Sequence, residues 1–351
     1  MPDPLCYVLH CGNLYGTERM ALATLECLQS DFMPILITPP GAVVAEAQQR
    51  GITVHIFDSL TTLAKLLRQL LIQYPRLVVM DTGLKQSFLL WMWNLIYRRS
   101  LLHLHIIHGG TNERQSYGRK HYLNFLDTQF VANSEYVRHR LVNYGVLAER
   151  ITVVENFLPA TPVRPRREAF TQMGVREIIV VSRIDPIKRV DLLLEALTRH
   201  PQLSKLSVHI LGTGQDLETL QARAEKFHPN VQFLGFVTDV PEQLATADLL
   251  VHLCPVEPFG LAIIEAMAAN IPVLVPDTGG AANLVEDGVS GFRFHANDVN
   301  HLANRLLALM NTPPQILNRV VEGARQSLIT RFSAERGTNQ YRQLLLDISQ
   351  R

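Results

Sequence analysis

The chain has 351 residues, of which 47% are hydrophobic and 19% are charged, and its formal net charge at pH 7 is +1. This length and composition favour two domains that each bury a large core. The near-neutral charge gives no reason to expect a nucleic-acid partner, and no apolar run reaches the ~18 residues that a membrane-spanning helix needs.

The four cysteines are scattered and show no C-x-x-C spacing, so we expect buried thiols in a reducing compartment rather than disulfides or zinc ligands. The first expected strand begins almost at the N-terminus, without a preceding basic and apolar leader, so no signal peptide is expected. Together these features predict a cytoplasmic protein. The cysteines are Cys6, Cys11, Cys27 and Cys254.

Residues 1–157 alternate short apolar runs with helical stretches. Uniformly apolar strands separated by helices are typical of a parallel sheet that is covered on both faces. The expected strands are Leu5–His10, Met33–Thr38, Ile52–Phe57, Arg76–Met80, Leu102–Ile107, Gln129–Ala132 and Ile151–Val154.

The first expected strand leads into the glycine turn Gly12–Arg19 (G-N-L-Y-G-T-E-R), which opens a helix. Such a turn lets the backbone approach a ligand and points N–H groups toward it. The candidate ligand contacts in this turn are Gly16 and Thr17. The turn is not G-x-G-x-x-G, so the dinucleotide-binding fingerprint is absent.

The strand Leu102–Ile107 ends in His108, which two glycines follow. A histidine at this edge of a sheet is a candidate ligand contact, although strand-end histidines are often simply hydrogen-bonded. His103 and His105 alternate with apolar residues, and we interpret them as structural. Ser134 follows the next strand, and helix capping alone could explain it.

The segment Phe88–Arg99 (F-L-L-W-M-W-N-L-I-Y-R-R) combines two tryptophans with a basic end. Two interpretations stay open. It could lie on a membrane interface and meet a lipid-linked acceptor. It is also one helix of the alternating pattern and would then be buried, which is the interpretation we favour.

Residues 158–167 contain three prolines, which cannot join a strand ladder, and predict a linker. The alternating pattern then restarts over residues 168–332, and residues 333–351 form a last helix that begins at Ser333. The expected strands are Glu177–Val181, Leu206–Leu211, Val231–Leu234, Asp248–Leu253, Pro272–Val275 and a short one near Phe292.

Arg183 and Lys188 lie on the loop after the first strand of this second domain. Two cations at the mouth of a sheet suit a departing diphosphate, because they stabilise the charge that develops as the bond breaks. Gly212 marks another glycine turn at a strand end. Phe236 and Val237 follow the next strand.

The segment Glu257–Asn270 (E-P-F-G-L-A-I-I-E-A-M-A-A-N) predicts a loop and then a helix over Leu261–Ala269. Gly260 enters this helix and Asn270 ends it in a left-handed conformation. A helix N-terminus favours an anion such as phosphate. Glu265 lies about one turn inside, so its carboxylate can reach a group beside that phosphate.

This segment resembles the E-x7-E motif of retaining GT-B glycosyltransferases, in particular glycosyltransferase family 4 (glycosyl transferases group 1). The resemblance extends to S-R-x-x-x-x-K at Arg183 and Lys188 and to G-G-x-E-R near Gly16. It implies an α/β GT-B fold, in which two doubly wound Rossmann-like domains face one another across a cleft. It also implies that the last helix crosses back to the first domain.

By the same resemblance, the enzyme would move a sugar from a nucleotide-diphosphate donor, such as a UDP- or GDP-sugar, to a hydroxyl of a sugar, glycan or lipid-linked acceptor. Arg183 and Lys188 would bind the diphosphate and Glu265 the ribose. The backbone at Phe236 and Val237 would lie at the nucleotide base. Glu257, with Phe259–Leu261, would bind the sugar, and His108 and Gly16 would face it. The resemblance implies front-face attack with retention, with neither a metal nor a cofactor.

Three positions depart from the family pattern: Tyr15 and Phe157 replace glycines, and Asn283 stands where glutamate is usual. Two alternatives stay open. One is a GT-B nucleotide-sugar epimerase or hydrolase, and the other is a non-catalytic nucleotide-sugar-binding protein.

Overall fold

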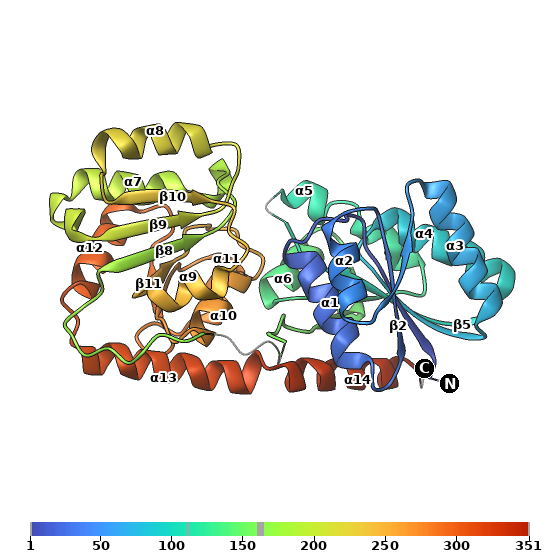
Figure 1. Ribbon diagram of the computed structural model, residues 1–351. Coiled ribbons are helices and arrows are strands. Elements are labelled where there is room, and N and C mark those ends of the chain that lie inside the picture. Colours follow the sequence, from blue (N-terminus) through green and yellow to red (C-terminus); the bar gives the residue numbers. More distant parts are fainter. Residues whose placement is uncertain (1, 111, 160–164, 350–351) are drawn as a thin grey trace. The chain divides into compact units, whose positions relative to one another are not determined.

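The computed structural model describes residues 2–110, 112–159 and 165–349, which form two compact units (Figure 1). The first unit comprises the chain up to Pro159 and again from Ser333 onward. The second comprises the residues between them, up to Phe332. Of the expected linker 158–167, residues 160–164 lie outside the described residues.

The first unit contains a seven-stranded parallel sheet in the order β3-β2-β1-β4-β5-β6-β7. The strand order reverses beside β1, so the loops that follow β1 and β4 diverge there. The strands are β1 (Pro4–Val8), β2 (Met33–Thr38), β3 (Thr53–Ile56), β4 (Arg76–Asp81), β5 (Ser100–Ile107), β6 (Gln129–Ala132) and β7 (Ile151–Val153).

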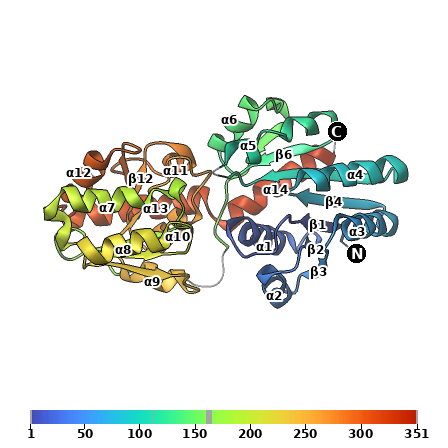
Figure 2. The ribbon, with the colours of Figure 1, turned by 90° about the horizontal axis from the view of Figure 1, so that it is seen from above.

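Helices cover both faces of this sheet (Figures 1 and 2). On one face α1 packs against α2 and α14, and on the other α3 packs against α4. The helices are α1 (Gly16–Leu28), α2 (Ala42–Gln49), α3 (Leu60–Gln73), α4 (Leu84–Tyr97), α5 (Glu113–Ser116), α6 (Glu135–Asn143) and α14 (Ala334–Ser349), with 3-10 helices η1 (Lys120–Phe125) and η2 (Ala148–Arg150).

The second unit contains a six-stranded parallel sheet in the order β10-β9-β8-β11-β12-β13, which reverses between β8 and β11. The strands are β8 (Glu177–Val181), β9 (Ser207–Leu211), β10 (Val231–Gly235), β11 (Leu249–Val251), β12 (Val273–Pro276) and β13 (Phe292–Phe294).

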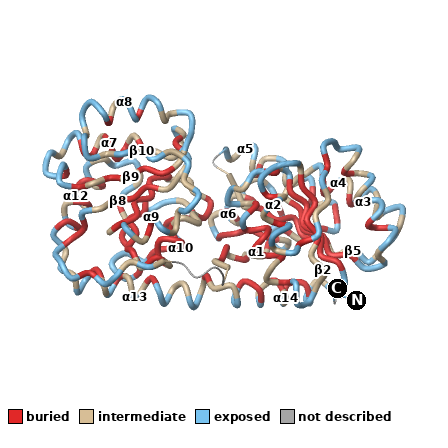
Figure 3. Tube along the Cα trace, viewed as in Figure 1, coloured by how far each residue is buried: buried red, intermediate tan, exposed pale blue. Residues whose placement is uncertain are grey.

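Helices again cover both faces, and the buried part of the chain is concentrated in the strands (Figure 3). α7 contacts α8 and α12, whereas α10 contacts α9, α11 and α13. The helices are α7 (Val190–Arg199), α8 (Leu217–Phe227), α9 (Val240–Thr246), α10 (Leu261–Ala268), α11 (Gly279–Leu284), α12 (Val299–Leu309) and α13 (Pro314–Arg331), with η3 (Pro186–Lys188) and η4 (Pro201–Lys205).

Every strand expected from the sequence is present, and most boundaries agree within two residues. The apolar runs predict them well because strands that are buried on both faces need uniformly apolar sequences. The expected stop of α10 is also confirmed: Asn270 has a φ of 59°, the left-handed conformation that ends a helix.

Two expectations about burial are wrong in part. Cys6 and Cys254 are buried, but Cys11 and Cys27 are only half-buried, although all four are free thiols. The helix at 88–99 is α4, and its outer face is exposed rather than buried, with Leu95 62% exposed. Among the described residues, no helix is long and apolar enough to cross a membrane.

Candidate functional site

The site residues predicted in the second unit all lie at one edge of its sheet. They follow β8, β9, β10 and β11, which are successive neighbours in the sheet and run parallel. Parallel strands end at the same edge, and ligands of open α/β sheets bind where the strand order reverses. In this sheet that point lies between the loops after β8 and β11.

At this point Lys188 and Glu257 meet. Lys188 ends η3 in the loop after β8, and Glu257 lies in the loop after β11. The Lys188 Nζ donates a hydrogen bond to Glu257 Oε2 at 2.5 Å. Their side chains are only 12% and 14% exposed, so this is a largely buried ion pair.

Each member of this pair holds the other in its charged form. Burial alone would raise the pKa of Glu257, but the Lys188 ammonium and the nearby His252 outweigh it and hold this pKa well below its usual range. Burial alone would lower the pKa of Lys188, but the Glu257 carboxylate outweighs it and raises that pKa. Nζ of Lys188 therefore remains a cation at neutral pH.

Arg183 supplies a second cation beside this pair. It lies in the same loop as Lys188, and its positive charge acts on Lys188. Its guanidinium contacts the Asp185 carboxylate at 2.9 Å and is 55% exposed. Lys188 is thus a fixed, buried cation, whereas Arg183 is an accessible one.

The loop with Glu257 leads directly into α10. Gly260 is the residue before the helix, and its φ of 102° is a conformation that a side chain would strain. Phe259 is buried against Phe332, Leu261 is half-buried at the first position, and Glu265 is 5% exposed. In the first turn of α10 the Ile263 N–H donates to the Gly260 carbonyl at 3.0 Å, and this N-terminal end of the helix is the end that favours an anion.

The loop after β9 packs closely on the loop that carries Arg183. A Cβ on Gly212 would lie 1.9 Å from the Ser182 carbonyl oxygen, so only glycine fits there. The Gly212 N–H also donates to the Gly235 carbonyl at 2.7 Å, which joins the ends of β9 and β10. Just beyond, Phe236 is 71% exposed and Val237 is half-buried.

In the first unit, the predicted glycine turn begins α1. Gly16 is exposed and Thr17 is half-buried in the first turn of the helix. Tyr15 can stand where the family pattern has glycine, because its φ of −95° is a backbone conformation that any residue adopts. The Tyr15 N–H donates to the Glu18 carboxylate at 3.0 Å, which caps the helix.

His108 lies just beyond β5. Its Nε2 is 3.0 Å from the hydroxyl of Tyr7, and its Nδ1 is buried without a hydrogen-bond partner among the described residues. Burial, with a smaller effect of His10, lowers the pKa of His108 to about 4. The imidazole is therefore neutral at pH 7 and retains one ring nitrogen for a further hydrogen bond.

Ser134 is the residue that caps α6, and the Val137 N–H donates to its Oγ at 3.2 Å. The capping interpretation of Ser134 is therefore confirmed.

Asn283, the third departure, is an exposed residue of α11 whose carbonyl accepts from Arg331.

The sequence did not single out two groups that the structure brings together. His252 Nε2 lies 3.4 Å from Glu257 Oε2, the same oxygen that accepts from Lys188. In the first unit, Asp81 hydrogen-bonds both His103 and His105, and the Lys120 Nζ lies 2.6 Å from His105 Nε2. The sequence offered one signal for each group, a polar residue at the end of an apolar strand. This residue is His252 for the first group and Asp81 for the second.

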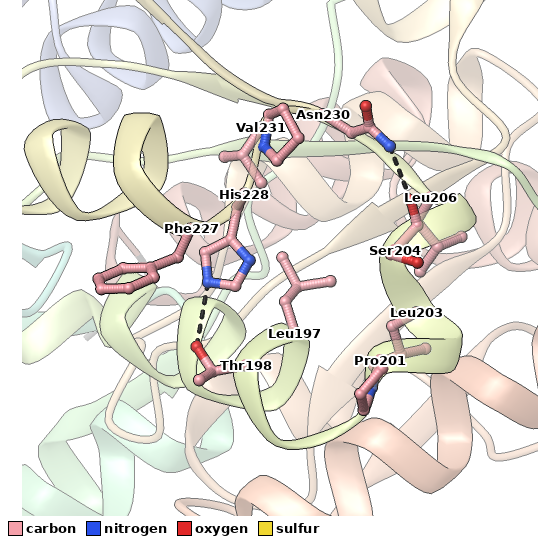
Figure 4. A pocket seen from close by; sticks show the side chains of 11 residues that line it. Leu197, Thr198, Pro201, Leu203, Ser204, Leu206, Phe227, His228, Asn230 and Val231 are labelled. Carbon is pink, nitrogen blue, oxygen red and sulfur yellow. Dashed lines mark hydrogen bonds between the residues drawn. The ribbon is translucent and has the colours of Figure 1, made fainter.

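A separate pocket of about 340 Å³ lies at the opposite edge of the second sheet. It borders Leu206 and Val231, at the amino ends of β9 and β10, and it contains the Thr198–His228 and Ser204–Asn230 hydrogen bonds (Figure 4). None of the predicted site residues lines it.

Comparison with known proteins gives two kinds of similarity. Residues 165–327, slightly less than half of the chain, match the family model described as glycosyl transferases group 1. Over 173 residues the chain is 27% identical to N-acetyl-alpha-D-glucosaminyl L-malate synthase of Bacillus anthracis, covering 49% of this chain and 45% of that protein. It is 31% identical over 214 residues to D-inositol 3-phosphate glycosyltransferase of Kribbella flavida, covering 53% and 49%.

The chain therefore matches about half the length of these curated relatives. Its structure is similar over nearly its whole length to the crystal structure of Anabaena HepE in complex with UDP, with a TM-score of 0.82 and 21% identity. That comparison covers 98% of this chain and 100% of the other. The prediction of a GT-B fold built from two Rossmann-like domains is thus confirmed.

Proposed function

We propose that this protein is a retaining glycosyltransferase that moves a sugar from a UDP-sugar to an acceptor hydroxyl. The observation that carries the proposal is the buried Lys188–Glu257 pair at the point where the second sheet reverses its strand order. The match of residues 165–327 to glycosyl transferases group 1 supports the reaction class. The named relatives are a synthase and a glycosyltransferase, so an epimerase, a hydrolase or a non-catalytic protein is not favoured.

The choice of UDP rests on structural neighbours. Three crystal structures of Anabaena HepE contain UDP, UDP with glucose, or UDP-glucose. In our proposal the exposed ring of Phe236, with Val237 beside it, lies against the base, and Gly212 lets the backbone approach the nucleotide. Glu265 would bind the ribose. The sugar and the acceptor stay unassigned.

The proposed chemistry uses the cations of the second unit. The bond between the anomeric carbon and the phosphate oxygen breaks, and Lys188, Arg183 and the first turn of α10 stabilise the diphosphate that leaves. The acceptor hydroxyl attacks from the same face and gives its proton to the departing phosphate. This route needs no enzyme nucleophile and no metal, because the chain supplies the positive charge.

The remaining residues would position the donor sugar. Glu257 and the segment Phe259–Leu261 would bind its hydroxyls, and the cation of Lys188 would keep the Glu257 carboxylate ionised for this role. We assign His108, with Gly16 and Thr17, to the same sugar by resemblance. The neutral imidazole and its available Nδ1 fit a hydroxyl as hydrogen-bond partner.

The test uses Arg183→Gln, because this side chain is 55% exposed and substitutions at exposed positions usually change stability little. With UDP-sugars and a panel of acceptors, we expect transfer to fall by about 10²-fold, as for loss of one group that stabilises transition-state charge. Arg325→Gln is the matched control, since Arg325 is 46% exposed and pairs with a nearby carboxylate, Glu322. Equal transfer by both variants would refute the site assignment, and no stabilisation by UDP in thermal denaturation would refute the donor.

A further inference from the structure

Helix α4 of the first unit is apolar on both of its faces. Its inner face packs on the sheet through Leu90, with Trp93 and Tyr97 against the same core. Between Phe88 and Tyr97 the only polar residue is Asn94, whose Oδ1 accepts from the Arg99 N–H near the end of the helix. A helix that is apolar all round is normally covered on every side.

The outer face of α4 is nevertheless exposed. Five large apolar side chains recur there at the i, i+3, i+4, i+7 and i+8 spacing of one helical face. We call them the α4 outer face: Phe88 (38% exposed), Trp91 (43%), Met92 (39%), Leu95 (62%) and Ile96 (60%). The 3-10 helix η1 contacts α4 and exposes two more aromatic rings, Tyr122 (49%) and Phe125 (87%).

Lysine and arginine predominate on the helices that form and flank this face. From Ser59 to Asn112 the only acidic residue is Asp81, which is fully buried and bonded to two histidines. The helices α3 and α4 therefore carry cations and no carboxylate of their own, and the neighbouring exposed acids in the chain are Asp58, just before α3, and Asp127, just after η1. The cations on and beside these helices are Lys65, Arg68, Arg76, Lys85, Arg98 and Arg99, the last half-buried and the others exposed.

We propose that the α4 outer face binds the surface of an anionic lipid bilayer. Apolar side chains on one helical face, tryptophan among them, with an excess of lysine and arginine around it, are the pattern of an interfacial helix. The cations would attract acidic headgroups, and each lysine or arginine close to a charged membrane contributes favourably to binding. α4 has 14 residues, fewer than the ~20 that a spanning helix needs, so it would lie in the plane of the interface.

The charge pattern argues against the alternative of a second copy of this chain. A two-fold symmetric dimer would place the same surface on both sides of the contact. The cations of α3 and α4 would then face each other with no acidic residue on either helix to pair with, and like charges repel. Anionic lipid supplies the opposite charge that this surface lacks.

The chain contains a natural reporter for the test. Its two tryptophans are both in α4, and Trp91 is exposed whereas Trp93 packs on the core. We expect the emission of the full-length protein to shift to shorter wavelength with vesicles of phosphatidylcholine and phosphatidylglycerol. The shift should be absent in Trp91→Phe and should weaken with added salt.

Cosedimentation with the same vesicles tests the apolar contact. The double variant Leu95→Gln, Ile96→Gln should bind about tenfold more weakly or worse, since it removes the two most exposed side chains of the face. The matched control is Ile329→Gln, Leu346→Gln, which changes two aliphatic residues that are 56% and 55% exposed elsewhere. The control should bind like the parent protein.

Three results would overturn the proposal: no binding to anionic vesicles, equal binding by the Leu95→Gln, Ile96→Gln variant, or equal binding to pure phosphatidylcholine. A dimer in buffer that this variant dissociates would instead assign the face to a second copy. None of these measurements uses a sugar donor or an acceptor. The membrane proposal can therefore be refuted while the proposed glycosyl transfer holds, and the glycosyl transfer can be refuted while the membrane proposal holds.

Discussion

Lys188 and Glu257 depend on each other more than either depends on its surroundings. Both side chains are largely buried, and each charge is stabilised there chiefly by the other, which lies within hydrogen-bond distance. A buried ion pair is weak evidence of net stability, but the removal of one partner leaves an uncompensated buried charge. The cost of losing Lys188 should therefore exceed the cost of losing both charges.

We predict that Lys188→Met lowers the free energy of unfolding by about 3 kcal/mol, because it strands the Glu257 carboxylate. The double variant Lys188→Met, Glu257→Gln should recover more than half of that loss. Urea denaturation at pH 7 measures both. If the double variant were as unstable as the sum of the two single variants, the pair would not be coupled.

Acid should remove the contribution of this pair in the parent protein. The pKa of Glu257 is depressed below its ordinary 4.5 by folding, so the stabilisation is complete above that pH and is lost as the pH falls toward the folded value. Glu257→Gln has no such group. Its stability should therefore decrease less than that of the parent when the pH falls below 4.5.

The individual cations were predictable from the sequence, but their partner was not. Arg183 and Lys188 follow an apolar strand directly, so local sequence places them at the edge of a sheet. Lys188 and Glu257 are 69 positions apart, and they meet only because β8 and β11 are neighbours. Periodicity predicts that strands exist but does not give their order in the sheet.

At the scale of the elements, the loop after β12 supports the loop that carries Glu257. The Gly280 N–H donates to the Glu257 carbonyl at 2.6 Å, and the Thr278 hydroxyl donates to the Pro255 carbonyl at 2.8 Å. A Cβ on Gly280 would lie 1.9 Å from the Pro258 carbonyl oxygen. The start of α11 therefore fixes the position of the 255–258 backbone.

We predict that Gly280→Ala shifts this backbone, destabilises the protein by about 2 kcal/mol, and weakens UDP-sugar binding. Gly288→Ala is the control, because the added methyl group meets nothing within 4 Å, although Gly288 has a φ of 74°. Calorimetry and denaturation of the two variants measure the difference. A larger loss of binding in Gly288→Ala would contradict the supporting role of α11.

One element also shows that an apolar sequence pattern does not always correspond to burial within the chain. The strands and helices lie close to where the apolar periodicity predicted them, because nearly all of them bury one or both faces within the unit to which they belong. α4 has the same apolar sequence, yet only its inner face contacts the core of the first unit. Sequence alone does not distinguish a helix that is covered by protein from one whose cover lies outside the chain.

At the scale of the whole molecule, the first unit is built from both ends of the chain. Residues from Ser333 onward form α14, which packs against α1 and buries Tyr341, Leu344 and Leu345. The pattern of apolar residues predicted the helix, and its place against the first domain was expected only by resemblance. Contact between segments that are 300 residues apart is not encoded in local sequence, as the Arg342–Asp31 ion pair illustrates.

If α14 stabilises the first unit, two adjacent leucines should behave differently. Leu345 is 4% exposed, whereas Leu346 is 55% exposed. We predict that Leu345→Ala costs about 3 kcal/mol, because it removes a buried side chain and leaves a cavity, and that Leu346→Ala costs under about 0.5 kcal/mol. Tryptophan fluorescence reports this unfolding for the first unit alone, because Trp91 and Trp93 are the only tryptophans. An unchanged fluorescence transition in Leu345→Ala would show that the first unit folds without support from α14.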